Sequence, residues 1–456
     1  MSSQKEIREI EIYSTKRKIR KHRISPKVIE REIRNILSRK VSGTLLGIFL
    51  LIPEHLRLGT WDLIKSWTGD LSGGLKARLA FQIVNEAALC VNGIRQTRSL
   101  NHKGFELANG LPFIATDKEI HNLLAEHTIE EGKQLQINLA RLRESLGHYS
   151  GNLWAFDPHR ITTFSKRIMP KKKSKKGNLS KSVLQTFFSL DAETGQPFGF
   201  TIGSSGVTVT KASIDLLKMM KSVLPFKQTL LVADTEHESR ILIDYINESD
   251  EYDILMPAAR RKGIMQIIKK LDYQRHWAGY STAERSHKYK KSQYGFRLIG
   301  QRCGEIKYSY KPFIATGDQL SLELLSEKYP QRWKIEEFFN FEGKMGWDRA
   351  STMNLNIRYG KMSLALIAQA VTYELKKKLS APYKQWTAEH LANSIFKSID
   401  ADLRVQDDTI IVTMYNVPET SGLKKHYENL PEKLKAEKIN PKIPWLYNFK
   451  LDFRFK

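Results

Sequence analysis

The segment between residues 152 and 256 constrains the fold most, because apolar runs, turns and helical patterns follow one another there in a fixed order. Residues 182–190 and 197–203 are apolar and flank a polar turn, which predicts a β-hairpin. Beyond the hairpin, helix-like spacing alternates with short apolar strands; the remaining elements are strands 152–156, 229–233 and 253–256 and helices near 214–224 and 239–246. This order predicts an α/β domain built on a mixed sheet with flanking helices.

Two of these predicted strands end in a carboxylate. Asp157 follows the strand at 152–156, and Asp234 follows the strand at 229–233. If the two strands are neighbours, the side chains converge at one edge of the sheet, where two like charges are costly unless a cation lies between them. Carboxylate oxygens suit Mg²⁺ or Mn²⁺. An Asp after a strand also commonly caps the next helix, so each residue alone has a second interpretation.

A third acid lies in a segment with helical spacing, residues 329–339. Arg332 and Glu336 are four residues apart and therefore share one face of that helix. On spacing alone, a weak, exposed salt bridge is the favoured interpretation of this pair.

The charge of the chain indicates the class of partner. Its 456 residues include 74 Lys+Arg and 49 Asp+Glu, a formal net charge of +25, which favours a polyanion such as nucleic acid or an anionic membrane. The longest apolar stretch, residues 41–52, is shorter than the about 20 residues of a membrane-spanning helix. No apolar run that would indicate a secretory signal follows the first residues. We therefore expect a cytoplasmic protein that binds nucleic acid and no membrane.

Cysteine usage excludes two further classes of protein. Cys90 and Cys303 are the only cysteines and lie far apart in the sequence. A disulfide-stapled scaffold and a cysteine-based zinc site are therefore both excluded.

Three stretches carry much of the positive charge. Residues 1–40 hold 13 Lys/Arg and 5 Asp/Glu, and the basic residues at 171–176 and 424–456 form two further runs. The candidates for phosphate contact within the first two runs are Arg17, Lys18, Arg20, Lys171, Lys172 and Lys173. We expect the second run to lie on the loop after the first Asp strand. Any single run is also consistent with a solvated surface, but together they favour DNA contact, and each neutralised phosphate steepens the salt dependence of binding by about 0.9 in log–log slope.

The first 148 residues are expected to be helical. Ser25-Pro26 predicts an N-cap followed by Pro at the first helical position. Thr116 with Glu119, and Thr128 with Glu131, predict two capping boxes and hence helices near 117–127 and 129–146. Two adjacent helices are consistent with a DNA-binding helix–turn–helix and also with an ordinary helical bundle.

With Tyr329, Arg332 and Glu336 at these spacings, the chain resembles the DDE transposases of bacterial insertion sequences, in the group with the Tyr-Arg-Glu-Lys (YREK) signature. The order Asp157, Asp234, Glu336 matches the catalytic triad of that family, and residues 235–335 match the place of its β-rich insertion. The signature Lys would fall at Gly343, whereas Lys344 comes one residue later.

The resemblance implies an RNase H-like fold and two-metal chemistry that cuts transposon ends and joins the freed 3′-OH to target DNA. It implies that Asp157, Asp234 and Glu336 hold two Mg²⁺ ions, with Mn²⁺ as a substitute. Tyr329, Arg332 and Lys344 would contact DNA phosphates. The implied partners are terminal inverted repeats, target DNA and a second copy of the chain in a synaptic homodimer, acting at a bacterial nucleoid.

The resemblance also suggests five parts along the chain. These are a helical, basic DNA-binding region at 1–148, catalytic segments at 149–272 and 319–380, a β-rich insertion at 273–318 and a dimerisation or DNA-contact region at 381–456. In the insertion, aromatic and basic residues alternate, which suits either base stacking or cross-strand pairs in a sheet. Trp277 is the only Trp there and is the candidate to stack on a flipped base. The last region is expected to contain a hairpin that turns at Asp407 and Asp408.

Three other functions remain open from the sequence. An RNase H-like nuclease without strand transfer would need the same acids. A DNA-binding protein derived from an inactive transposase would not, and the presence of all three acids disfavours it. A basic RNA-binding protein would be expected to carry a recognisable RNA-binding module, and no such pattern is found.

Overall fold

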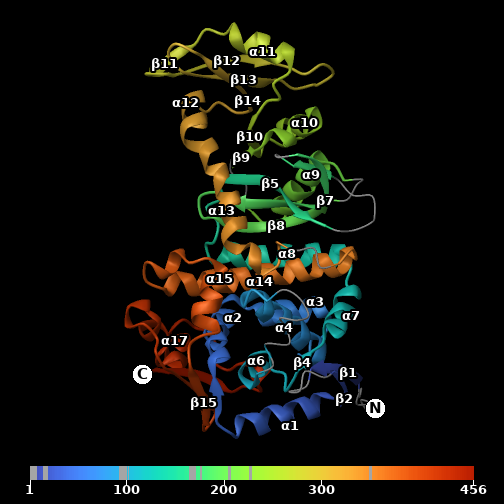
Figure 1. The fold of residues 1–456 in the computed structure, drawn as a ribbon, viewed down its shortest axis with the longest axis vertical. Helices are drawn as coiled ribbons and strands as arrows, with labels where there is room; N and C mark the ends of the chain where they lie inside the picture. Colours follow the sequence, from blue (N-terminus) through green and yellow to red (C-terminus); the bar gives the residue numbers. More distant parts are fainter. Residues whose placement is uncertain are drawn as a thin grey trace. The chain divides into compact units, whose positions relative to one another are not determined.

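The computed structural model describes residues 8–13, 19–91, 100, 102–163, 171–174, 177–203, 207–224, 229–348 and 352–456, with only the backbone described at 171–174 and 177–181. Contacts divide the chain into two compact units (Figure 1). One unit is Arg143–Phe339, and the other combines Met1–Leu142 with Asn340–Lys456.

The unit Arg143–Phe339 is built on a ten-stranded sheet. The strand order is β11 (Gln274–Trp277), β12 (Tyr280–His287), β13 (Phe296–Cys303), β14 (Ser309–Ala315), β10 (Tyr252–Pro257), β9 (Thr229–Ala233), β5 (Leu153–Thr162), β7 (Gly177–Asp191) and β6 (Lys171–Ser174), and β8 (Gln196–Gly203) also pairs with β7. Strands β5, β9 and β10 run parallel, whereas the other pairings are antiparallel. The predicted mixed α/β sheet is therefore confirmed.

The parallel centre of the sheet is buried, as its sequence requires. All five residues of β9 are buried, and a strand covered on both faces reads as a continuous apolar run. Helix α9 (Val209–Lys221) contacts β7 and β8, and helix α10 (Arg240–Ser249) contacts β10 (Figure 1). Thr208 and Ser239 cap these helices by accepting backbone N–H groups over 3.2 and 3.1 Å.

The segment 273–318 is rich in strands, and it extends the central sheet. Strand β14 pairs with β10 through Leu255↔Ala315 and Met256↔Ile314, so β11–β14 continue the same sheet beyond β10. At the opposite edge, the expected loop position of Lys171, Lys172 and Lys173 is wrong. These residues form β6, because their backbone pairs antiparallel with residues 180–182 of β7.

The second unit combines many helices with two small sheets. Its longer helices are α1 (Pro26–Leu37), α3 (Thr60–Thr68), α4 (Leu75–Ala88), α7 (Asp117–Ala125), α8 (Ile129–Ser145) and α14 (Leu355–Lys378). The buried helix α14 packs against α4 and α7. It also lies close to α8, since a Cβ on Gly132 would lie 2.6 Å from the ring of Tyr359, and Ser363 donates to the Gly132 carbonyl over 3.3 Å.

The predicted helix starts in this unit have mixed outcomes. Ser25 caps α1 by accepting the Val28 N–H over 3.4 Å, as expected. Thr128 and Glu131 form a reciprocal capping box at α8, with bonds of 3.2 and 2.6 Å. The capping box at Thr116 is wrong, because Glu119 instead accepts the backbone N–H of Glu11 over 3.1 Å.

The N-terminal region is less helical than expected. Strands β1 (Arg8–Tyr13) and β2 (Ile19–Ile24) pair antiparallel, and β4 (Ile114–Ala115) joins β1. Arg20 lies exposed on β2, whereas Arg17 and Lys18 lie outside the described residues. The basic run therefore contributes a strand where the sequence favoured a purely helical region.

The C-terminal residues join the N-terminal ones in the second small sheet. Strands β15 (Ala401–Gln406) and β16 (Thr409–Met414) form the predicted hairpin, and Asp407 adopts a φ of 54° at its turn. Strand β3 (Val41–Gly43) pairs with β15, and β17 (Lys450–Phe455) pairs with β16. The boundaries of the five predicted parts stay predictions, while the contacts group residues 381–456 with the N-terminal segment.

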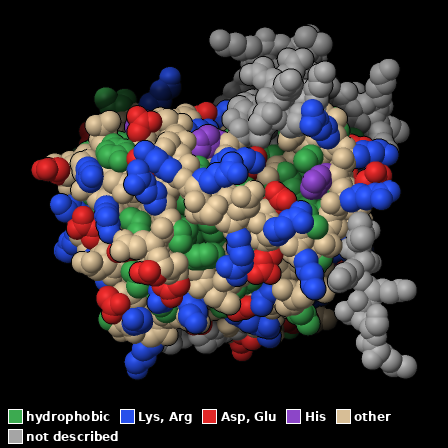
Figure 2. Space-filling model, turned by 90° about the horizontal axis from the view of Figure 1, so that it is seen from below, with side chains coloured by type: hydrophobic (Ala, Val, Ile, Leu, Met, Phe, Trp, Pro, Cys, Tyr) green, Lys and Arg blue, Asp and Glu red, His purple; other side chains and the backbone are tan. Residues whose placement is uncertain are grey.

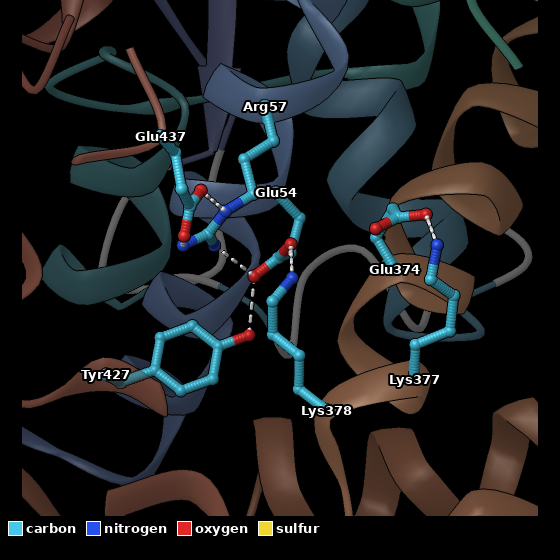
Figure 3. A network of polar contacts seen from close by, with 7 residues as sticks. All are labelled: Glu54, Arg57, Glu374, Lys377, Lys378, Tyr427 and Glu437. Atoms are coloured by element: carbon cyan, nitrogen blue, oxygen red, sulfur yellow. Dashed lines mark hydrogen bonds and ion pairs between the residues drawn. The ribbon is translucent and has the colours of Figure 1, made fainter. Parts of the chain in front are cut away.

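A buried carboxylate reinforces this association (Figure 3). Glu54, on α2 (Ile52–Leu58), is fully buried and accepts hydrogen bonds from Tyr427 over 2.6 Å and from Arg57 over 2.9 Å. Lys378, at the end of α14, also pairs with Glu54. Arg57 reaches on to Glu437 over 2.6 Å, so a single network links α2 with three C-terminal segments.

Among the described residues, no helix combines the length and the apolar character needed to cross a bilayer.

Candidate active site

Asp157 and Asp234 come from adjacent parallel strands. The last parallel pair between β5 and β9 is Phe156↔Ala233, and each Asp is the next residue of its chain. The expected convergence is thus explained by strand register. The expectation that Asp157 ends its strand is wrong, because β5 continues to Thr162 through antiparallel pairing with β7.

Asp234 caps the turn that follows it, which is one of its two expected roles. Its side chain accepts the backbone N–H of Glu236 over 2.9 Å and caps the short 3-10 turn η3 (Thr235–His237). Asp234 nevertheless lies close enough to Asp157 for its charge to raise the pKa of that residue.

The third acid reaches the site through an irregular helical segment. A π-helical turn η4 (Leu324–Lys328) leads into the 3-10 turn η5 (Tyr329–Arg332), which contacts β5 and β9, and the α-helix α13 (Trp333–Glu342) follows. Residues 329–339 are therefore not one regular α-helix as predicted. Phe339 fixes α13 near β5 by stacking on His159 at a ring-centroid distance of 4.2 Å.

Arg332 connects two of the predicted acids. Its Nη1 donates to Oδ1 of Asp157 over 3.1 Å, and its Nη2 donates to Oε1 of Glu336 over 2.7 Å. Its side chain is only 16% exposed, so the pairing with Glu336 is more than the exposed i,i+4 bridge that the spacing allowed. A planar guanidinium suits this forked contact between two carboxylates.

Burial and mutual repulsion perturb the acids. Burial raises the pKa of Asp157 from 3.8 to about 7, the nearby Asp234 charge adds to the increase, and Arg332 opposes it. The pKa of Asp234 is also raised, first by burial and then by the charge of Glu236. Groups with such shifts in one place are typical of catalytic or ion-binding sites.

Two further polar residues, Glu236 and His237, lie in the turn η3 that follows Asp234. Glu236 pairs with Arg160 of β5. His237 is 1% exposed, and its Nδ1 lies 2.9 Å from the hydroxyl of Ser213 on α9. Burial, together with the charges of Arg332 and Arg160, lowers the pKa of His237 to about 3, so its ring is neutral near pH 7.

The donor chemistry of this site fits hard divalent cations. Asp157, Asp234 and Glu336 offer carboxylate oxygens. A cation would relieve the repulsion from Asp234, which adds to the effect of burial in raising the pKa of Asp157. Across the part of the chain that the structure describes, however, no three His, Cys, Asp or Glu side chains are grouped closely enough to hold an ion. Arg332 hydrogen bonds occupy one oxygen each of Asp157 and Glu336 in this arrangement.

The other predicted DNA contacts belong to other elements of the chain. Lys344 belongs to the unit that includes Asn340–Lys456; it lies in the turn η6 (Gly343–Met345) and pairs with Asp348 over 3.2 Å. Trp277 is 50% exposed on β11 and stacks on Tyr280 with ring centroids 4.3 Å apart. The side chains of Lys171, Lys172 and Lys173 are not among those described.

Basic and acidic side chains are mixed on the face drawn in Figure 2. The described Lys and Arg side chains lie there among Asp and Glu side chains. In segment 273–318, one basic side chain makes cation–π contacts within the protein. The guanidinium of Arg302 lies over the rings of Tyr273 and Tyr308, 4.5 and 4.7 Å from their centroids. These contacts favour the cross-strand interpretation for those residues.

Residues 150–370 match the family model described as the transposase DDE domain, a range that includes Asp157, Asp234, Arg332 and Glu336, and this match supports a transposase. No curated protein matches the chain. Among solved structures, the chain is similar to one described as a cryo-EM structure of the piggyBac transposase synaptic complex with hairpin DNA, at 10% identity, covering 79% of this chain and 82% of that chain with a TM-score of 0.43.

Proposed function

We propose that the protein is a DDE transposase that cuts the ends of a mobile element and joins the freed 3′-OH to target DNA. The observation that carries this proposal is the placement of Asp157 and Asp234 on adjacent parallel strands, with Arg332 linking Asp157 to Glu336. The match of residues 150–370 to the transposase DDE domain supports it. The central mixed sheet with β5, β9 and β10 in parallel is compatible with an RNase H-like catalytic domain.

In this proposal Asp157, Asp234 and Glu336 hold two Mg²⁺ ions, with Mn²⁺ as a substitute. Bound ions would supply activation of the attacking oxygen and stabilisation of the leaving oxygen in phosphoryl transfer. The low exposure of Asp157 keeps water away from its carboxylate, which strengthens its interaction with any cation. Ionised Asp157 and Asp234 are required, since protonated carboxyl groups are poor ligands.

Arg332 has a dual task in the proposed mechanism. Without DNA its guanidinium holds Asp157 and Glu336 in place through one hydrogen bond to each. With DNA bound, the same fork is suited to a phosphate oxygen, and Tyr329, half-buried in the same turn η5, would contact the same strand. Release of the carboxylates by Arg332 would then leave their oxygens available as ligands.

The finer assignments are also proposals. We place the chain in the YREK group of bacterial insertion sequences, with Lys344 as the least supported member because it does not follow the signature spacing. Arg17, Lys18, Arg20 and the lysines at 171–173 would contact double-stranded DNA, and a homodimer would hold two transposon ends. Trp277 would stack a flipped base on the ring face opposite Tyr280, and quenching of a 2-aminopurine base near the transposon end would test this.

An RNase H-like nuclease without strand transfer is the second candidate, because it would use the same three acids. Incubation with DNA that carries the inverted repeats flanking the gene, in Mg²⁺, tests for cleavage. A second reaction with a pre-cut end tests for joining to a plasmid. Cleavage with no joined product would favour the nuclease, and DNA binding with neither reaction would favour a protein derived from an inactive transposase.

A further inference from the structure

His237 has a buried ring nitrogen that faces a proposed catalytic carboxylate. The ring is 1% exposed, and Nε2 has no hydrogen-bond partner among the described residues. Nε2 lies 3.9 Å from Oδ1 of Asp234, too far for a hydrogen bond but close enough for a small rotation of either side chain to make one. A buried polar atom left unpaired is costly, so such a rotation is favoured.

The other side of the ring is fixed by Ser213. This fully buried residue places its hydroxyl 2.9 Å from Nδ1 of His237 and 2.9 Å from the carbonyl oxygen of Val209. The hydroxyl has one proton, and an ionised Asp234 favours giving it to Nδ1, because Nε2 then carries the ring proton and can donate to the carboxylate. The Val209 carbonyl then loses the hydrogen bond from the Ser213 hydroxyl, which costs little. This carbonyl lies in the first turn of α9 and still faces the helical N–H of residue 213.

These contacts act on one oxygen of Asp234. Oδ1 accepts the Glu236 N–H over 2.9 Å and lies 3.9 Å from Nε2 of His237. Within the described residues no hydrogen bond to Oδ2 is found. A carboxylate held through one oxygen presents the other in a fixed direction, which is how surrounding hydrogen bonds orient metal ligands.

We propose that His237, held by Ser213, is a positioning residue that fixes the Asp234 carboxylate so that Oδ2 is directed to a divalent cation. The proposal rests on the proposed function of Asp234 as a ligand and adds a relay from Ser213 through His237 to Asp234. It requires contact of His237 with Asp234 only, not with the cation or DNA.

Substitution of His237 by residues with amide side chains tests the roles of the two ring nitrogens separately. His237→Asn places an amide near the position of Nδ1 and can keep the bond to Ser213, whereas His237→Gln places it near Nε2 and can reach Asp234. His55 offers a matched control, because it is 1% exposed and its Nδ1 lies 2.7 Å from the Thr60 hydroxyl in the other unit. His55→Asn and His55→Gln therefore report the effect of replacing a buried imidazole away from the site.

The experiment titrates the full-length protein with Mn²⁺ in the absence of DNA and follows free Mn²⁺ by electron paramagnetic resonance. His237→Asn is expected to weaken Mn²⁺ binding by about tenfold or more, as is common when a residue that orients a metal ligand is lost. His237→Gln and both His55 variants are expected to stay close to wild type. Ser213→Ala is expected to give a smaller loss in the same direction, and thermal unfolding checks that each variant is folded.

Equal Mn²⁺ affinity in His237→Asn and wild type would overturn the inference, as would equal losses in the Asn and Gln variants. If Asp157→Asn abolishes Mn²⁺ binding and DNA cleavage while the His237 variants behave as wild type, the proposed function stands and this inference falls. If the His237 variants show the expected order of Mn²⁺ affinity but no DNA is cut, the positioning role stands and the transposase proposal falls. A wild-type protein that binds no Mn²⁺ would overturn both.

Discussion

Asp157 and Asp234 each lie one residue beyond Phe156↔Ala233, the last parallel pair between strands β5 and β9. This register brings together two acids that are 77 positions apart in the sequence, 234 − 157 = 77, without any long side chain having to reach across the sheet. Burial and then the nearby charge of Asp234 raise the pKa of Asp157, so ionisation of Asp157 is costly in free energy. Sites that gather like charges in this way are typically built for a cation or for catalysis.

The raised pKa predicts that Asp157 destabilises the metal-free protein at alkaline pH. Between its usual pKa of 3.8 and the folded value of about 7, the folded state binds a proton that the unfolded state does not. The stability contributed by this proton is full below pH 3.8 and is lost as the pH rises through about 7, at up to about 1.4 kcal/mol per pKa unit.

Asp157→Asn imitates the protonated carboxyl group. In EDTA, the variant should unfold at a higher temperature than wild type at pH 8, and this difference should shrink towards pH 4. Thermal unfolding followed by circular dichroism across this range is the measurement. A variant less stable than wild type at pH 8 would contradict the claim that the ionised Asp157 carboxylate destabilises the metal-free protein.

Arg332 should be irreplaceable by Lys. An ammonium group cannot donate in parallel to Asp157 and Glu336 in the planar geometry of a guanidinium. Arg332→Lys should therefore lower the cleavage rate at saturating Mg²⁺ by about tenfold to a hundredfold, corresponding to about 1.4–2.7 kcal/mol in the barrier. Lys334 lies two residues from Arg332 and pairs with Glu337 over 2.9 Å. Lys334→Arg serves as the control and should cleave normally.

The buried network around Glu54 should dominate the stability of its unit (Figure 3). Glu54→Ala would leave Arg57 and Lys378 without their shared carboxylate, and breaking a buried pair in this way costs about 3–5 kcal/mol. Tyr427→Phe removes one hydrogen bond and should cost about 1–2 kcal/mol.

Urea unfolding measures both losses of stability. Lys435→Ala is the control, because its pair with Glu432 is exposed on both sides and should contribute less than about 1 kcal/mol. Similar stabilities of the Glu54 and Lys435 variants would show that the buried network contributes no more to the free energy of unfolding than an exposed ion pair does.

Arg20 should contribute to DNA binding through phosphate contact. It is exposed on β2, and loss of one phosphate contact reduces the magnitude of the log–log salt slope by about 0.9. Arg20→Ala should therefore bind every DNA sequence more weakly, with a shallower dependence on salt in fluorescence anisotropy. Lys65→Ala should leave the slope unchanged, since Lys65 already pairs with Asp62 over 2.8 Å. Equal slopes in both variants would remove Arg20 from the DNA contact surface.

Local signals in the sequence predicted local structure well where one residue determines it. Ser25 at the start of α1 and the pair Thr128 and Glu131 at α8 have the expected bonds. Thr116 begins the same pattern, yet the carboxylate of Glu119 accepts a hydrogen bond from the backbone N–H of Glu11, more than 100 residues away in the sequence. A capping-box pattern covers only four residues, so it cannot predict a tertiary contact with a residue distant in the sequence.

The candidate site shows the same division. The apolar strands before Asp157 and Asp234 predicted both acids, and the spacing of Arg332 and Glu336 predicted their shared face. The spacing could not show that Arg332 also bonds Asp157, because that contact depends on where the turn η5 lies against β5. His237 and Ser213 lie on separate elements, and neither has a motif that links them.

The most direct test of the account compares wild type with Asp157→Asn and Asp234→Asn on DNA carrying the flanking inverted repeats, in Mg²⁺. Gel analysis of end cleavage and of joining from a pre-cut end is combined with DNA binding of the same proteins. We predict that wild type gives both products, and that both variants bind DNA as wild type does but lose cleavage and joining by at least a thousandfold, about 4 kcal/mol. Cleavage retained in either variant would contradict the assignment of the active site.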